Sequence, residues 1–451
     1  MTVALERPAA AEQLGAFVAG LTLETLPAEV VEKVRCNLLH NLACAMAAHS
    51  VGAEAWALAR GRLPAEATLI CAGDRVPVEQ AAFANAVLVH GRAQDDTHFA
   101  ARCHAGAAVT PVALALAEAR RLGGDRFIPA LVAGYEVATS LGEMFALATT
   151  RRGFRSSMVF GTLGAAATAA SLLGLDAQRT ADAIAIATSF SGGLNEAWIE
   201  GSTEWRWELG MAARNGIVAA ELAAAGAHGA PRAFEGAAGF VRAFTGDDAW
   251  SAPSDWELGS RWRLLDVIYK PYPVCNILQT SVALAIELAC EYDLRSDDVA
   301  AMRCYLNPDD RSYPGTVNPG PYRDVGATLM SAQYCVAMAL RDRTATMQGL
   351  RHFDDPELLA LVARTDVLPD DALPLLATRL EIDTVDGRAI VREVIPDDAT
   401  FGWTWDGVVA NTKVLAAEMQ DGEKTLPLLV ARVSEIATVP SLGPLVEVLS
   451  T

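Results

Sequence analysis

Residues 90–104 gather titratable side chains that could move a proton or hold a metal ion. The stretch reads HGRAQDDTHFAARCH and contains three of the chain's seven histidines, two adjacent aspartates and a cysteine. Imidazole suits proton transfer near neutral pH, because its ordinary pKa lies close to that range. His98 and His104 are six residues apart, which is not the i, i+4 spacing of a helical zinc site. The pattern therefore favours acid–base chemistry, and we expect no metal.

Lys270 is a second candidate, because lysine is scarce in this chain. It is one of only four lysines and lies in the segment YKPYPVC, flanked by Tyr269 and Tyr272, which could donate hydrogen bonds. Apolar surroundings make the pKa of an ammonium adjustable and let it hold a carboxylate. Alternatively, its stem packs beneath a solvated ammonium. Cys275 follows five residues later, either as an acid–base thiol or as a buried inert one.

The net charge limits the partners that the chain can bind. The sequence has 36 basic and 55 acidic residues among 451, a formal net charge of −19. A field of that sign repels polyanions, so we expect neither nucleic acid nor an anionic membrane as a partner. A small-molecule substrate is compatible even if it is anionic, because one local basic pocket is enough to hold it.

The cysteines and the first residues predict a cytoplasmic protein. The eight cysteines form no CxxC pair and no metal-finger spacing, so reduced thiols are expected. Residues 1–10 show no basic segment followed by an apolar core, so no secretory signal is expected. The apolar run at residues 158–175 approaches membrane-spanning length, but its Gly, Ala and Thr content favours a buried helix.

Apolar periodicity predicts a mainly α fold. Residues 26–48 begin with a proline in the first turn and then repeat apolar side chains at three- and four-residue spacing. The pattern recurs to about residue 250, with glycine-containing junctions that mark helix ends. No period of 20 to 50 residues recurs, so a solenoid is not expected.

The composition changes near residue 251, where Pro, Trp and Tyr become frequent. Farther on, residues 380–394 alternate apolar and polar side chains around an Asp-Gly turn, which predicts a β-hairpin. We therefore predict a large all-helical domain and a smaller α/β domain, with the C-terminal tail returning to the helical one. The predicted segments are 1–265, 266–400 and 401–451.

Several motifs, in this order, resemble the MmgE/PrpD family. They are LPAEVVEKVRCNLLHNLACAMA, DDTH followed by HAGAAVTPVALALAEA, GFRSSMVFGTLGAAATAASLLGL, EGSTEWRWELG and KPYPVC. They extend over nearly the whole chain, and together they are more specific than any one alone. The resemblance implies a large helical domain, a smaller α/β lid and a homodimer. It also implies an active site between domain and lid that needs no obligatory cofactor.

The family's dehydratases, decarboxylases and epimerases share one need, which is to move a proton on or off carbon next to a carboxylate or carbonyl. This takes a base and cationic or hydrogen-bonding groups. His104 stands where the family carries the histidine of its HPS-type motif, although it could instead cap a helix or lie in the core. The candidate catalytic residues are His104, Lys270, Asp96, Glu208 and Tyr272. The candidate substrate-binding residues are Thr97, His98, Arg155, Trp205, Arg206, Tyr269, Cys275 and Gln279.

The chain departs from the family pattern at several positions of the implied site. Members commonly have GFH where Arg155 replaces the histidine, and TKRLH where Trp205 replaces the lysine and Glu208 the histidine. Ala93 replaces the first aspartate of the usual DFDDT, and Gln279 stands where members often have a histidine. Groups that would bind a tricarboxylate or shuttle its protons are therefore missing, while an indole and a carboxylate have been gained.

These departures predict a lyase or isomerase that acts on a metabolite less anionic than a tricarboxylate, with an aromatic or amine-bearing group. A setting in specialised metabolism fits that reading. A catalytically inactive relative that binds a ligand or stabilises a partner is an alternative, favoured by the lost histidines. An ordinary 2-methylcitrate dehydratase is another, and the replaced Lys and His argue against it.

Overall fold

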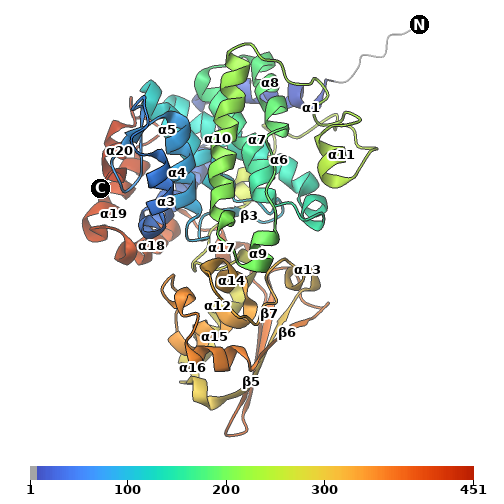
Figure 1. The fold of residues 1–451 in the computed structure, drawn as a ribbon, viewed down its shortest axis with the longest axis vertical. Coiled ribbons are helices and arrows are strands. Elements are labelled where there is room, and N and C mark those ends of the chain that lie inside the picture. The colour runs from blue at the N-terminus through green and yellow to red at the C-terminus, as the bar shows by residue number, and fades with distance from the viewer. Residues whose placement is uncertain (1–7) are drawn as a thin grey trace.

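The computed structural model describes residues 8–451, and their fold is mainly α. Figure 1 shows a large mass of helices with a smaller, sheet-containing part at one end. We call the larger part the helical body and the smaller part the sheet unit. Buried apolar side chains form two clusters, one within the helical body and one centred on residues 274–390 of the sheet unit.

The helical body is built from both ends of the chain. Its N-terminal helices are α1 (Ala10–Gly20), α2 (Ala28–Ala47), α3 (Ala53–Ala59), α4 (Val78–His90), α5 (Ala105–Arg120), α6 (Gly124–Arg151), α7 (Ser156–Leu173), α8 (Ala177–Thr188), α9 (Glu196–Glu200), α10 (Glu204–Ala224) and α11 (Phe240–Thr245). The C-terminal helices are α18 (Trp405–Leu415), α19 (Gly422–Ser434) and α20 (Gly443–Leu449). Both α18 and α19 pack on α2.

Small side chains let the central helices of the body approach closely. A Cβ added to Gly164 of α7 would lie 2.6 Å from the carbonyl oxygen of Gly134 in α6, so only glycine fits there. The helix α7 is the one helix in residues 8–451 that is long and apolar enough to cross a membrane, yet 83% of it is buried inside the structure. The small and apolar residues of α7 therefore pack against neighbouring helices inside the protein.

The sheet unit carries a four-stranded mixed sheet in the order β6-β5-β7-β8. Its strands are β5 (Val299–Leu306), β6 (Thr365–Pro369), β7 (Thr378–Thr384) and β8 (Ala389–Val394). The predicted hairpin is confirmed, because β7 pairs antiparallel with β8. The helices of this unit are α12 (Gln279–Glu291), α13 (Pro308–Arg311), α14 (Val325–Met330), α15 (Ala332–Asp342) and α16 (Pro356–Val362), and the short α17 (Asp398–Phe401) leads back to the body.

A short strand pairing joins two distant candidate segments. Strand β3 (Thr97–His98) pairs antiparallel with β4 (Val267–Ile268), with Thr97 opposite Ile268. A second small pair, β1 (Ala67–Thr68) and β2 (Arg75–Val76), lies elsewhere in the body. Because β4 ends two residues before Lys270, the β3–β4 pairing brings the lysine to the stretch that contains His104.

Candidate active site

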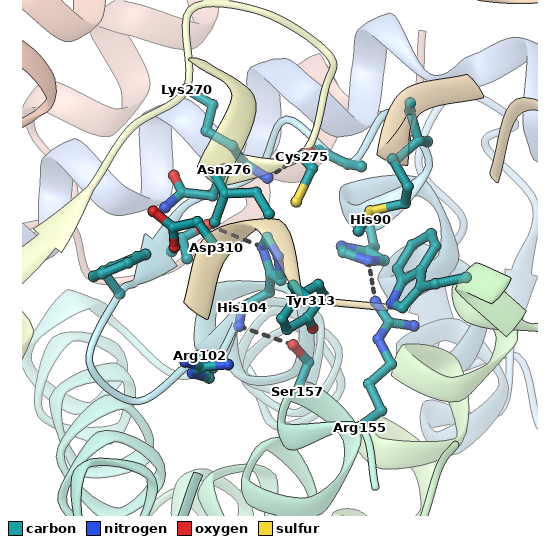
Figure 2. Close-up of a pocket in the computed structure, with 17 residues that line it drawn as sticks. His90, Arg102, His104, Arg155, Ser157, Lys270, Cys275, Asn276, Asp310 and Tyr313 are labelled. Atoms are coloured by element: carbon teal, nitrogen blue, oxygen red, sulfur yellow. Dashed lines mark hydrogen bonds between the residues drawn. The ribbon is translucent and has the colours of Figure 1, made fainter. Parts of the chain in front are cut away.

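A small cavity of about 70 Å³ lies where the helical body meets the sheet unit. Figure 2 shows side chains from both parts turned toward it. The polar and titratable lining residues from the body are His90, Thr97, Arg102, His104, Arg155, Ser157 and Lys270; those that follow Lys270 are Cys275, Asn276, Asp310 and Tyr313. His104 and Lys270, the two leading sequence candidates, thus face one cavity.

His104 is held in a defined orientation at the N-cap of α5, one residue before the helix begins. Its Nδ1 lies 3.2 Å from a carboxylate oxygen of Asp95, 3.0 Å from the carbonyl oxygen of Asp96 and 3.1 Å from Oγ1 of Thr97. Two of these atoms can only accept, so the proton sits on Nδ1 and the lone pair on Nε2. Burial, followed by the charge of Lys270, lowers the pKa of His104, which keeps the ring neutral and able to accept a proton.

Asp95 links His104 to a second imidazole, that of His90. Both carboxylate oxygens of Asp95 lie within 3.0 Å of Nδ1 of His90. Burial raises the pKa of Asp95, but the two imidazoles outweigh it and hold this pKa well below its usual range. The side chains of His90 and Asp95 are at most 1% exposed, whereas that of His104 is 18% exposed. His104 is therefore the imidazole that a ligand can reach.

Lys270 supplies a buried ammonium to the cavity. Its side chain is almost fully buried, and Nζ donates a hydrogen bond to the carbonyl oxygen of Ala93, where the family usually has an aspartate. Burial lowers the pKa of Lys270, while Asp95 acts against this. A buried cation with one neutral partner can receive a substrate carboxylate, because the ligand then provides the missing counter-charge.

Two of the departures from the family pattern touch one another. Arg155 donates a 2.8 Å hydrogen bond to Glu208 and another to the carbonyl oxygen of Trp205. Its second NH2 group lies 2.6 Å from Nε2 of His90 and occupies the lone pair of that ring. Burial lowers the pKa of His90 to about 3, so His90 stays neutral. The guanidinium of Arg155 is thus neutralised by Glu208 and hydrogen-bonded to three partners before any ligand arrives.

The remaining cavity wall carries Cys275, Asp310 and Tyr313. Burial raises the pKa of the Cys275 thiol to about 11 and that of Tyr313 to about 12, so neither ionises near neutral pH. Burial also raises the pKa of Asp310, to about 6. The Arg102 guanidinium lies 5.8 Å from the centre of the Tyr313 ring, and it makes no ion pair within the described residues.

Asp96 points away from the cavity into the helical core. Its carboxyl accepts hydrogen bonds from Asn41, from the Tyr135 hydroxyl and from the backbone amide of Gly106. Burial raises the pKa of Asp96 to about 7. The structure therefore separates Asp96 from the ligand space and gives it a role in joining α2, α5 and α6, while Asp95 contacts the cavity residues His90 and His104.

Four other sequence candidates also lie outside the cavity lining. His98 is buried beside Glu143 and accepts a hydrogen bond from the Ala101 amide. The Tyr269 hydroxyl donates to Asn37. The side chain of Gln279 bonds to the backbone of Tyr272 and to the Val274 carbonyl, and so shapes the turn that follows Lys270. Tyr272 takes part in these hydrogen bonds through its backbone N–H and carbonyl oxygen.

Trp205, Arg206 and Glu208 stand behind or beside the cavity rather than in it. The ring of Trp205 is 1% exposed and packs on His90 with ring centres 5.2 Å apart. Arg206 stacks on Trp205 and faces a separate groove near Asp324. Glu208 acts on the site through Arg155, and its other oxygen accepts from the Leu194 amide.

The sequence reading missed five of the groups that build the site. These are His90, Asp95, Arg102, Asp310 and Tyr313. His90 and Asp95 lie within residues 90–104, and their five-residue spacing from the end of a predicted helix is a usable sequence signal. Arg102 lies in the same stretch, but an isolated arginine carries no specific signal. Asp310 and Tyr313 carry no local signal either, because they reach the cavity only when the sheet unit docks on the body.

The hydrogen bonds of the candidate site bear on whether it could hold a metal. Ligand atoms of His90, Asp95 and His104 lie within 4.8 Å of one another. However, Asp95 already engages Nδ1 of both rings, and the cationic Arg155 occupies the remaining nitrogen of His90. A divalent ion would have to displace these bonds beside a guanidinium and an ammonium, so the arrangement favours acid–base chemistry.

The chain belongs to the MmgE/PrpD family, since residues 12–253, more than half of its length, match the MmgE/PrpD N-terminal domain. The resemblance seen in the sequence is thereby confirmed. The family is enzymatic, which supports a lyase-like function for this chain.

Similar proteins include cis-aconitate decarboxylase from Aspergillus terreus, which is 25% identical over 412 residues covering 84% of this chain and 83% of the relative. The cis-aconitate decarboxylase-like protein oryM from Aspergillus oryzae is 32% identical over 51% of this chain and 50% of its own length. Cis-aconitate decarboxylase from Homo sapiens is 34% identical over 44% and 42%, respectively.

Proposed function

We propose that this protein is a cofactor-independent lyase or isomerase that moves a proton at carbon next to a carboxylate or carbonyl group. The observation that carries the proposal is the geometry of His104, whose Nδ1 lies 3.2 Å from Asp95, whose Nε2 has no hydrogen-bond partner within residues 8–451, and which shares its cavity with Lys270. A base and a cation in one cavity are what abstraction of a carbon-bound proton requires.

The first step follows from these two groups. The Nε2 lone pair of His104 takes the proton from carbon, and the electron pair of the broken C–H bond moves into the adjacent carbonyl or carboxylate. Lys270 stabilises the negative charge that develops on oxygen. Asp95 stabilises the imidazolium, because its carboxylate lies 3.2 Å from Nδ1.

The substrate is proposed to be less anionic than a tricarboxylate. Arg155 and Trp205 replace a histidine and a lysine of the family pattern, and Glu208 cancels the charge that Arg155 adds. Two cationic side chains without an ion pair among the described residues, Lys270 and Arg102, remain around the cavity. That number fits one or two carboxylates.

The sheet unit is proposed to serve as a lid. It contributes Cys275, Asp310 and Tyr313 to a cavity whose base and cations come from the helical body. Movement of this unit would admit the substrate and then exclude water from the developing charge.

The test is proton exchange and turnover in D₂O, followed by ¹H NMR. The probes are cis-aconitate, 2-methylcitrate and iminodisuccinate beside a panel of small mono- and dicarboxylates. We expect exchange with a carbon acid of the panel and no efficient turnover of the three polyanionic probes. Full turnover of any of the three contradicts the proposed substrate class. Absence of exchange with every acid favours a catalytically inactive ligand-binding protein instead.

A further inference from the structure

Asp310 is a buried carboxyl that nothing in the proton-abstraction step uses. It lies on α13 of the sheet unit, is 3% exposed and lines the cavity that His104 and Lys270 enter from the helical body (Figure 2). One of its oxygens accepts a 2.7 Å hydrogen bond from the Leu376 amide. The other has no hydrogen-bond partner within residues 8–451, and no ion pair joins Asp310 to a cation there.

Burying a carboxylate without a counter-ion is costly, so such a group is rarely retained for stability alone. The Leu376 amide donates only one hydrogen bond to the Asp310 carboxylate. The charge of the Arg102 guanidinium acts on Asp310, but the two side chains form no ion pair. An unused acceptor that faces a ligand cavity marks the place where a ligand supplies the missing positive charge.

We propose that Asp310 is a specificity-determining residue that receives an ammonium group of the substrate, while the body cations take its carboxylate. The ligand class is then a small amino-carboxylate. This inference rests on the proposed function, because it concerns the ligand of the same cavity. It also agrees with the cancelled charge of Arg155, since an amino-carboxylate needs fewer cations than a tricarboxylate.

Binding should depend on pH in a direction set by Asp310. Because burial raises its pKa to about 6, Asp310 accepts an ammonium well above that pH and loses its charge below it. Other titratable or charged groups face the same space, so a variant must isolate its effect. These groups are His90, Arg102, His104, Arg155, Lys270, Cys275 and Tyr313, with Asp309 adjacent on α13.

The experiment is isothermal titration calorimetry of the whole chain with β-alanine, 3-hydroxypropionate and succinate, which differ only in the group at one end. We expect β-alanine to bind tightest at about pH 7.5 and to weaken about tenfold by about pH 5. Asp310→Asn should weaken β-alanine about thirtyfold or more and remove that pH dependence, while succinate gains affinity.

Asp309→Asn is the matched control, because Asp309 lies on the same helix but is exposed. It should bind β-alanine as the wild-type chain does. Tighter binding of succinate or of 3-hydroxypropionate by the wild-type chain overturns the inference, as does failure to bind any of the three, or an Asp310→Asn variant that binds β-alanine normally. None of these results depends on turnover, so proton exchange in D₂O judges the proposed function separately.

Discussion

The two walls of the cavity are built differently. On the helical-body wall, His90, Asp95 and His104 hold one another through hydrogen bonds, and Arg155 is bonded on both sides. On the sheet-unit wall, Asp310 has a single backbone partner in the described part of the chain. The base on the body wall is oriented without a ligand, whereas the sheet-unit wall has an acceptor that a ligand can complete.

This difference suggests that the body wall carries out the reaction and that the sheet-unit wall selects the ligand. A general base must be oriented before the substrate arrives, and fixed partners provide that orientation. A group that selects the substrate must keep a bonding capacity for it. Substitutions on the body wall should therefore remove turnover, and those on the sheet-unit wall should change which ligand binds.

The largest effect is expected from removing the base or its neighbouring cation. His104→Gln and Lys270→Ala should each lower kcat about 10³-fold, because one removes proton transfer and the other charge stabilisation. Steady-state kinetics on a substrate found by the D₂O screen measures this. Circular dichroism should show an unchanged fold, and unaltered kinetics for either variant would remove that residue from the proposed step.

Asp95→Asn comes next, with kcat lowered about 10²-fold or more. An amide can donate to Nδ1 of His104 and so favours the wrong tautomer, and it cannot stabilise the imidazolium. The loss should appear in kcat, with KM nearly unchanged. A change confined to KM would indicate that Asp95 only shapes the pocket.

Glu208→Gln tests the charge cancellation on the body wall. The substitution frees the Arg155 guanidinium from its 2.8 Å partner while keeping an acceptor for the Leu194 amide. Succinate binding, measured by calorimetry at low salt, should improve about tenfold. Unchanged succinate affinity would show that Arg155 does not act on the ligand.

Asp96→Asn should alter the pH dependence of stability more than activity. The folded-state pKa of Asp96 is raised to about 7, so the native state binds more protons than the unfolded one above about pH 4. The wild-type chain should thus lose stability relative to the variant as pH rises from about 4 to about 7. Denaturant unfolding of both proteins at several pH values checks the sign, and parallel curves would contradict it.

Tyr272→Phe should have the smallest effect, within about twofold in kcat and KM. The Tyr272 side chain lines no part of the cavity, and the contacts that order this turn use its backbone. A large kinetic loss would show that the turn rearranges when substrate binds.

The helical pattern, the hairpin and the segment that contains His104 could all be predicted from the sequence, because each depends on local periodicity or on a family motif. The choice between Asp95 and Asp96 could not. Adjacent side chains leave a loop in different directions, and only the positions of His90 and Tyr135 decide which carboxyl contacts the imidazoles of the site.

Asp310 could not be predicted as a site residue, for a different reason. It lies in a segment rich in Pro, Gly and Asn, residues 307–324, whose composition indicates a loop and nothing about its neighbours. Its contact with the cavity arises from docking of the sheet unit on the helical body, between residues about 200 positions apart. A local sequence pattern cannot predict a contact between residues so far apart in the chain.

The most direct test of the central claim is the tautomer of His104, read by ¹⁵N NMR of the histidine side chains, with His104→Gln identifying its signals among the seven histidines. The account predicts a neutral ring with the proton on Nδ1 and an unprotonated Nε2 near neutral pH, and loss of that preference in Asp95→Asn. A proton on Nε2, or a fully charged ring, would contradict the assignment of His104 as the base.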